Sequence, residues 1–246
     1  MLDPRAAWGL WVGVLAGLCL LGALLLQVAS NLANDYFDHQ HGVDTAGRLG
    51  PPRASAMGWI EPQRVWRATL LALGGATLVG VALVAAGGWP ILALGLLRLF
   101  AAVLYTGGPL PLGYVGLGDL LVFLFFGLGA VAGTWFVLAQ ASLTGGLLLP
   151  AWPTPVVGLT EIPLHVWLMG AAMGALSTAI LVVNNLRDRG TDAAAGKRTL
   201  AVRLGPTATR VSVLLPAGQV LNATRGLTWL VPDDALLALG GQPQTR

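Results

Sequence analysis

Long apolar segments alternate with short polar ones along most of this chain. About 20 apolar residues are enough for a helix to cross the hydrocarbon core of a bilayer. Glycine and proline break the apolar pattern, as at Gly87, Gly88 and Pro90, and such residues mark turns. We therefore expect an all-α, polytopic transmembrane helical bundle. The pattern predicts membrane-spanning helices over residues 6–30, 68–86, 91–106 (a short one), 120–140 and 163–184.

Composition supports a protein embedded in a lipid bilayer. The chain has 246 residues, of which 55% are hydrophobic and 10% charged, whereas a soluble domain carries about 25% charged residues. The basic residues form no run, so nothing favours a nucleic acid as partner. They gather instead in the segments 45–67 and 185–210, while 87–90 and 141–162 have none. The positive-inside rule then places both basic segments, together with 105–119, on the cytoplasmic side of a bacterial inner membrane.

Two acidic stretches end predicted spans on that same face. Asn31–Asp44 contains Asp35, Asp38 and Asp44, and the stretch from residue 184 to 204 contains Asp188 and Asp192. Acidic side chains beside a bilayer are costly and are usually functional. Asp35 and Asp38 are three positions apart, and Asp188 and Asp192 four, so each pair shares one face of a helix. Taken alone, the first stretch could also be a helix end with solvated acids, and the second a juxtamembrane loop.

Carboxylates converging from two helices suit a magnesium–diphosphate site. Mg²⁺ prefers oxygen ligands and is usually held by one or two carboxylates together with substrate phosphates. A metal placed there would stabilise the charge that develops as a diphosphate leaves an allylic carbon. Asparagines could add neutral ligands, basic residues could hold phosphate oxygens, and a tyrosine could stack on an acceptor ring. These candidate contacts are Asn31, Asn34, Asn185, Arg53, Lys197, Arg198 and Tyr105.

Four segments together resemble the UbiA superfamily of intramembrane prenyltransferases. They read NLANDYFDHQHGVD at 31–44, RLGPPRA at 48–54, YTGGPLPLGYVGLGDLLVFLFFG at 105–127 and NNLRDRGTDAAAGKRTLAVRLG at 184–205. Within the superfamily, they are most similar to the branch that prenylates 1,4-dihydroxy-2-naphthoate in menaquinone synthesis. The resemblance implies an all-helical fold around a central cavity that opens towards the membrane.

The resemblance also implies a reaction. Such enzymes transfer an all-trans polyprenyl group from polyprenyl diphosphate to 1,4-dihydroxy-2-naphthoate, release carbon dioxide and form demethylmenaquinone. By motif, Asp35 and Asp38 would bind Mg²⁺ and the diphosphate with Asp44 close by, and Asp188 and Asp192 would bind a second Mg²⁺. The naphthoate acceptor follows only from the resemblance.

Some features depart from the family pattern. The resemblance begins before the family's second helix, so we expect the first helix to be absent, with residues 1–210 as the prenyltransferase domain and 211–246 as a divergent or truncated tail. Arg98 lies inside the third predicted span, where it would bind an anionic substrate, snorkel to the surface, or mark a tilted span. Three other functions stay open: an aromatic prenyl or phytyl transferase with another acceptor, a cation-binding transporter, and an inactive fragment.

Overall fold

The computed structural model of the chain describes residues 4–42, 51–109, 111–144 and 156–209, and within these ranges it contains helices and no strand. Four of the helices are long and apolar enough to cross a membrane, and a fifth apolar helix is shorter. This confirms the predicted polytopic all-α bundle. The labelled elements are α1 (Pro4–Gln40), α2 (Pro62–Gly87), α3 (Trp89–Leu104), α4 (Gly118–Val122), η1 (Phe123–Leu128), α5 (Gly129–Leu143), η2 (Leu159–Glu161), α6 (Leu164–Arg187) and α7 (Arg189–Ala194). Residues 200–209 are helical as well.

Helix α1 extends ten residues beyond its predicted end at residue 30, to Gln40. Nothing between Asn31 and Gln40 breaks a helix, because the segment has no proline or glycine. The helix stops where Gly42 adopts a positive φ of 65°, the left-handed conformation that commonly ends helices. The first acidic stretch is therefore helical as far as Gln40, and Asp35 and Asp38 project from the last turns of a rigid element.

The turn between α2 and α3 lies where the sequence predicts it. Gly88 has a positive φ of 72° and connects the two helices directly, and Pro90 occupies the first turn of α3, where its missing N–H costs no hydrogen bond. With 16 residues, α3 is the shorter apolar helix, and its rise of about 24 Å falls below the hydrocarbon thickness of about 30 Å.

The fourth predicted span is one continuous rod made of α4, η1 and α5, with a π-helical segment in its middle. Gly127 in this segment lies directly against α6, since a Cβ there would be 2.6 Å from the carbonyl oxygen of Gly170. The absence of a side chain at Gly127 thus lets α6 approach the π-helical turn closely. Pairs of small residues give membrane helices this kind of contact.

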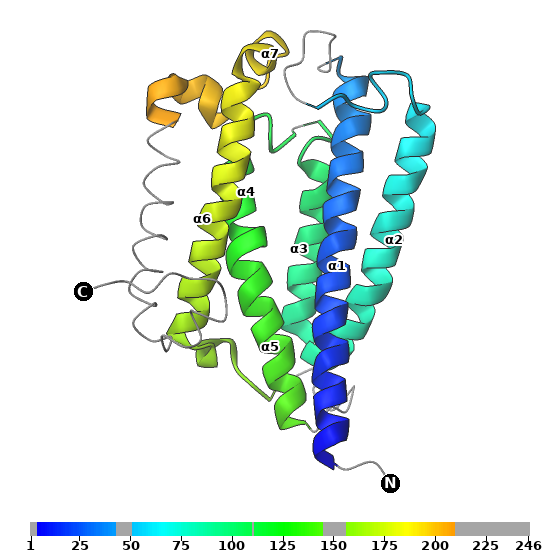
Figure 1. The fold of residues 1–246 in the computed structure, drawn as a ribbon, viewed down its shortest axis with the longest axis vertical. Helices are drawn as coiled ribbons and strands as arrows, with labels where there is room; N and C mark the ends of the chain where they lie inside the picture. Colours follow the sequence, from blue (N-terminus) through cyan, green and yellow to red (C-terminus); the bar gives the residue numbers. More distant parts are fainter. Residues whose placement is uncertain (1–3, 43–50, 110, 145–155, 210–246) are drawn as a thin grey trace, which may run out of the picture.

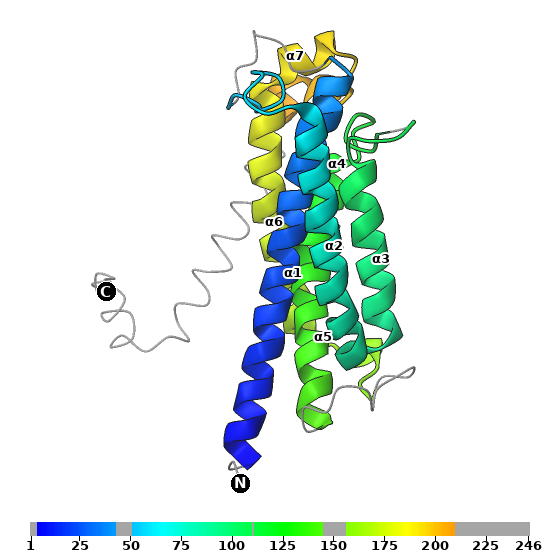
Figure 2. The same cartoon turned by 90° about the vertical axis from the view of Figure 1, so that its right-hand side faces the viewer.

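The bundle is packed tightly at one end and hollow at the other. Leu15, Ala86, Ile91, Phe136 and Val166 belong to one buried apolar cluster. This cluster includes the end of α2 and the starts of α3 and α6, which lie at the bottom of the bundle in Figures 1 and 2, the end from which α1 begins. Large apolar side chains on the outside of the helices are exposed, as expected for surfaces that face lipid.

Both acidic stretches lie at the other end of the bundle. Figure 1 shows the end of α1, the start of α2 and helix α7 together at the top. This confirms the prediction that the two stretches share one face. Asp44, most of the segment 141–155 and the tail 211–246 lie outside the described residues.

Candidate active site

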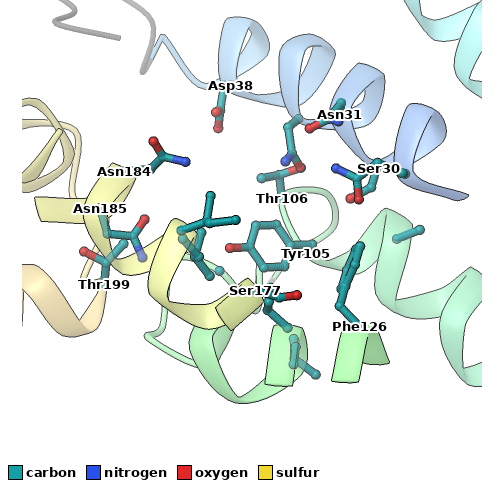
Figure 3. A pocket seen from close by; sticks show the side chains of 18 of the residues that line it. Ser30, Asn31, Asp38, Tyr105, Thr106, Phe126, Ser177, Asn184, Asn185 and Thr199 are labelled. Carbon is teal, nitrogen blue, oxygen red and sulfur yellow. The ribbon is translucent and has the colours of Figure 1, made fainter. Parts of the chain in front are cut away.

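A cavity of about 710 Å³ opens between α1, α3, the α4–α5 rod and α6. Figure 3 shows side chains from these elements around it, with Asp38 of α1 across from Asn184 and Asn185 of α6, and with Tyr105 below Asp38 in this view. Most of the predicted site residues line this cavity. They are Asn31, Asn34, Asp38, Arg53, Tyr105, Asn185, Asp188, Asp192 and Lys197.

Asp38 is the centre of a charged cluster at the cavity mouth. Its side chain is only 3% exposed, and its Oδ1 accepts a hydrogen bond from the Tyr114 hydroxyl at 2.6 Å. The Lys197 ammonium lies 2.9 Å from the same oxygen and 4.6 Å from the centre of the Tyr114 ring. Arg53 approaches the other oxygen at 3.9 Å. Because Asp38 belongs to the first acidic stretch and Lys197 to the second, this cluster joins the two stretches directly.

The second pair of aspartates surrounds the junction of α6 and α7. Asp188 ends α6, and its two carboxylate oxygens accept hydrogen bonds from Arg187 Nε and Nη2, each at 2.8 Å. Asp192 is 8% exposed, and its carbonyl oxygen accepts the Lys197 backbone N–H at 2.8 Å. The short helix α7 therefore brings Asp188, Asp192 and Lys197 to the same cavity.

Amide side chains are held in fixed orientations around the mouth. Asn34 Oδ1 accepts a hydrogen bond from the Thr106 hydroxyl at 2.7 Å, and the Asn185 amide donates to Asp119 Oδ1 at 3.4 Å. Both asparagines are thereby oriented by residues of other elements. Such preorganised dipoles are what binding of a charged group requires.

Tyr105 follows the last residue of α3 and lines the cavity. Burial raises the pKa of its phenol above the usual value, and the carboxylates of Asp119, Asp38 and Asp192 raise that pKa further. Tyr105 therefore stays protonated at physiological pH. Its hydroxyl can donate a hydrogen bond, and it does not act as a base.

Two of the described candidates lie elsewhere. Asp35 is 6% exposed but does not line the cavity; its Oδ1 accepts the Ser55 backbone N–H at 3.3 Å and so holds the segment that precedes α2. Arg198 does not line the cavity either, and its backbone N–H donates to the Tyr114 carbonyl oxygen at 2.7 Å. The metal and diphosphate roles of Asp35 and Arg198 stay predictions.

A sequence profile described as the UbiA prenyltransferase family matches residues 5–240, which is most of the chain. The chain belongs to this family. The match fits the observed bundle, in which two aspartate-containing stretches meet at one end of an apolar cavity.

Several UbiA relatives with curated names are similar over most of this chain. The 1,4-dihydroxy-2-naphthoate octaprenyltransferase of Haemophilus influenzae is 41% identical over 223 residues, covering 84% of this chain and 64% of that protein. The protein of the same name from Escherichia coli is 41% identical over 209 residues, covering 81% and 61%. The human UbiA prenyltransferase domain-containing protein 1 is 34% identical, covering 84% and 53%. The chain thus spans under two thirds of these relatives' lengths. No solved structure matches it.

Some lining residues of this UbiA cavity were not predicted. A polar stripe on α1 includes Gln27 and Ser30 beside the predicted Asn31, Asn34 and Asp38. Their spacing of three to four residues was a readable signal, because positions so spaced share a helix face. Thr106, Thr191 and Thr199 also line the cavity, but they lie outside the long helices, and their spacing in the sequence contains no comparable signal.

The donor set fits a divalent metal held jointly with a substrate. Among residues of the described ranges, no three His, Cys, Asp or Glu side chains are grouped closely enough to ligate one ion. Asp38, Asp188 and Asp192 nevertheless line one cavity, and all of them offer hard oxygen donors. Mg²⁺ needs only one or two carboxylates when phosphate oxygens and water complete its shell, so the residues present are sufficient for a metal–diphosphate complex.

Proposed function

We propose that this protein transfers an all-trans polyprenyl group from polyprenyl diphosphate to 1,4-dihydroxy-2-naphthoate, with loss of carbon dioxide, giving demethylmenaquinone in its reduced form. The observation that carries the proposal is the Asp38–Lys197 contact at the cavity mouth, which unites the two acidic stretches. The choice of acceptor draws on relatives named 1,4-dihydroxy-2-naphthoate octaprenyltransferase.

The polar mouth would bind the diphosphate. Asp38, Asp188 and Asp192 would hold Mg²⁺, which when bound neutralises the charge of the diphosphate. Lys197 and Arg53 lie beside Asp38 and would exchange this carboxylate for phosphate oxygens when the donor binds. Tyr114, whose hydroxyl donates to Asp38, would keep the carboxylate in place during that exchange.

The reaction balances without an oxidant. The bond between the first prenyl carbon and the diphosphate oxygen breaks, and its electron pair leaves with the diphosphate. Electrons of the aromatic ring form the new carbon–carbon bond to the prenyl group. The ring carboxylate leaves as carbon dioxide, and the electron pair of its bond returns to the ring. The apolar helices around the cavity would exclude water from the allylic cation, since the greater part of the cavity lining is apolar.

The site would face the cytoplasm of a bacterial cell, with the chain embedded in the inner membrane. Arg53, Arg64, Lys197 and Arg203 belong to the end of the bundle that carries the acidic stretches, in agreement with the positive-inside rule. A transporter is less well supported, since transporter sites lie near the bilayer midplane on broken helices, whereas Asp38 and Asp188 lie at helix ends.

A transfer assay tests the proposal. The purified full chain in lipid nanodiscs, given Mg²⁺, a polyprenyl diphosphate and 1,4-dihydroxy-2-naphthoate, should form the prenylated product and carbon dioxide in equal amounts. Asp38→Ala and Asp188→Ala should each lower turnover at least a hundredfold. Glu161→Gln, an exposed acid at the opposite end, is the matched control and should keep full turnover. Absence of product from the wild-type protein, or wild-type turnover in both alanine variants, would reject the proposal.

A further inference from the structure

Arg98 is a cation deep inside the cavity whose role the diphosphate site does not explain. It lies six residues before the end of α3, which places it about 9 Å below the mouth. Its Nη2 donates a hydrogen bond to the Phe125 carbonyl oxygen at 2.6 Å. Phe125 belongs to the π-helical segment, and such segments are frequent at functional sites. The contact points the guanidinium into the bundle, which excludes snorkelling.

The other basic side chains of the cavity already face carboxylates. Arg53 and Lys197 lie beside Asp38, and Arg187 binds Asp188. Arg98 also lines the cavity, but within the described ranges it forms no ion pair, and its buried Nε has no hydrogen-bond partner. A charged group inside a membrane helix is costly and is a functional candidate by default. Arg98 therefore keeps hydrogen-bond donor capacity that no described residue satisfies.

The surroundings define the chemistry of that anion. Phe126 follows the Phe125 that Arg98 contacts, and its side chain lines the cavity (Figure 3), so this part of the wall offers an aromatic face to a flat ring. Tyr105 lies seven residues after Arg98 along the chain, at the mouth end of α3. A diphosphate at this depth could not contact the carboxylates and the lysine at the mouth, because they lie about two helical turns away. A single carboxylate on a ring, in contrast, matches the planar guanidinium.

We propose that Arg98 binds the carboxylate of the aromatic acceptor and thereby selects an acceptor that carries an acidic group on its ring. The inference rests on the proposed prenyl transfer for the identity of the acceptor. It assigns Arg98 a specificity-determining contact at the deep end of the cavity, separate from the diphosphate at the mouth. No covalent step is assigned to Arg98.

Equilibrium binding tests this without requiring turnover. The probes are fluorescent 1-hydroxy-2-naphthoate, which lacks one of the two hydroxyls, and its neutral carboxamide, each titrated onto the full chain in nanodiscs without metal or diphosphate. The wild-type protein should bind the carboxylate about tenfold to a hundredfold more tightly than the amide, as one charge-assisted contact implies. Arg98→Gln should remove this preference and leave amide binding unchanged.

Two further variants separate this reading from simple misfolding. Arg98→Lys keeps the charge but loses the planar fork, so it should show an intermediate preference. Arg64→Gln repeats the neutralisation at an exposed arginine and should bind both probes as the wild type does. Each variant should elute as the wild type does in size-exclusion chromatography. If Arg98→Gln elutes differently, its binding data are set aside. The inference is then tested by the affinities of the wild-type protein for the two probes and by the preference of Arg98→Lys.

The outcomes are distinct from those of the transfer assay. Equal wild-type affinity for the carboxylate and the amide would overturn the inference even if prenyl transfer occurs. Displacement of the naphthoate by palmitate at equal concentration would also overturn it, because the site would then accept any carboxylate. An Arg98-dependent preference in a protein that transfers no prenyl group would support the inference and reject only the proposed function.

Discussion

The buried contact between Asp38 and Lys197 can be tested by a double-mutant cycle on stability. Asp38→Asn removes the acid from the cluster while keeping the size of the side chain. Lys197→Gln removes the main cation, and a third variant carries both changes. The two residues come from the distant acidic stretches, so their energetic coupling reports whether those stretches meet in the folded protein.

The geometry gives the expected magnitude. At 2.9 Å, and with an effective dielectric constant of about 20, the gross attraction is about 6 kcal/mol before desolvation. Lys197 and Asp38 are 12% and 3% exposed, and removing one partner of such a buried pair costs about 3–5 kcal/mol. We expect Asp38→Asn to lower the free energy of unfolding by about 3 kcal/mol. The double variant should be about 2 kcal/mol more stable than the sum of the single effects implies.

Unfolding in mixed micelles of mild detergent and dodecyl sulfate provides the measurement. The matched control is the same cycle on Glu61 and Arg64, an ion pair at 3.5 Å whose side chains are 64% and 75% exposed, where coupling should stay under about 0.5 kcal/mol. Additivity of Asp38→Asn and Lys197→Gln within about 0.5 kcal/mol would refute the buried contact.

Three further predictions follow from other contacts. Gly127→Val should lower the free energy of unfolding by about 1–3 kcal/mol, because the added side chain overpacks against α6. A Cβ at Gly74 would have no atom within 4 Å, so Gly74→Val should cost under about 1 kcal/mol in the same unfolding assay. Gln140→Leu should lower stability by about 1–3 kcal/mol with prenyl transfer unchanged, because Gln140 Oε1 accepts two backbone N–H groups and its amide donates to Val157. Because the pKa of Tyr105 is raised in the folded protein, the unfolded chain loses the phenol proton at a lower pH than the folded chain does, from about pH 10. Above that pH the free energy of unfolding of the wild type should fall more steeply with pH than that of Tyr105→Phe. Equal slopes of unfolding free energy against pH would contradict the raised pKa.

The fold was largely predictable because its signals are local. Runs of apolar residues and the Gly88–Pro90 turn predict the helices correctly, and the distribution of arginines predicts correctly that both acidic stretches share one end. The end of α1 was predicted too early because hydrophobicity falls at Asn31, whereas helical structure continues until Gly42 adopts a positive φ. Hydropathy reports where lipid contact ends; it does not report where the backbone stops being helical.

The sequence predicts which residues form the site better than it predicts how their side chains are arranged. Spacing predicts that Asp35 and Asp38 share a face, and both are on α1, yet only Asp38 lines the cavity. The difference arises because the backbone N–H of Ser55, which is distant in sequence, donates a hydrogen bond to the Asp35 carboxylate. The π-helical turn that presents the Phe125 carbonyl to Arg98 has no sequence signal either, since it depends on packing against α6.

The central claim is that both acidic stretches bind one magnesium–diphosphate group, and the most direct measurement is the binding of geranyl thiodiphosphate, an unreactive donor analogue. Titrated onto the full chain in nanodiscs, it should bind at one site per chain in the presence of Mg²⁺. Asp38→Asn and Asp192→Asn should each weaken that Mg²⁺-dependent affinity at least tenfold. The account would be contradicted if Asp192→Asn bound geranyl thiodiphosphate with wild-type affinity, or if the affinity of the wild type were the same with and without Mg²⁺.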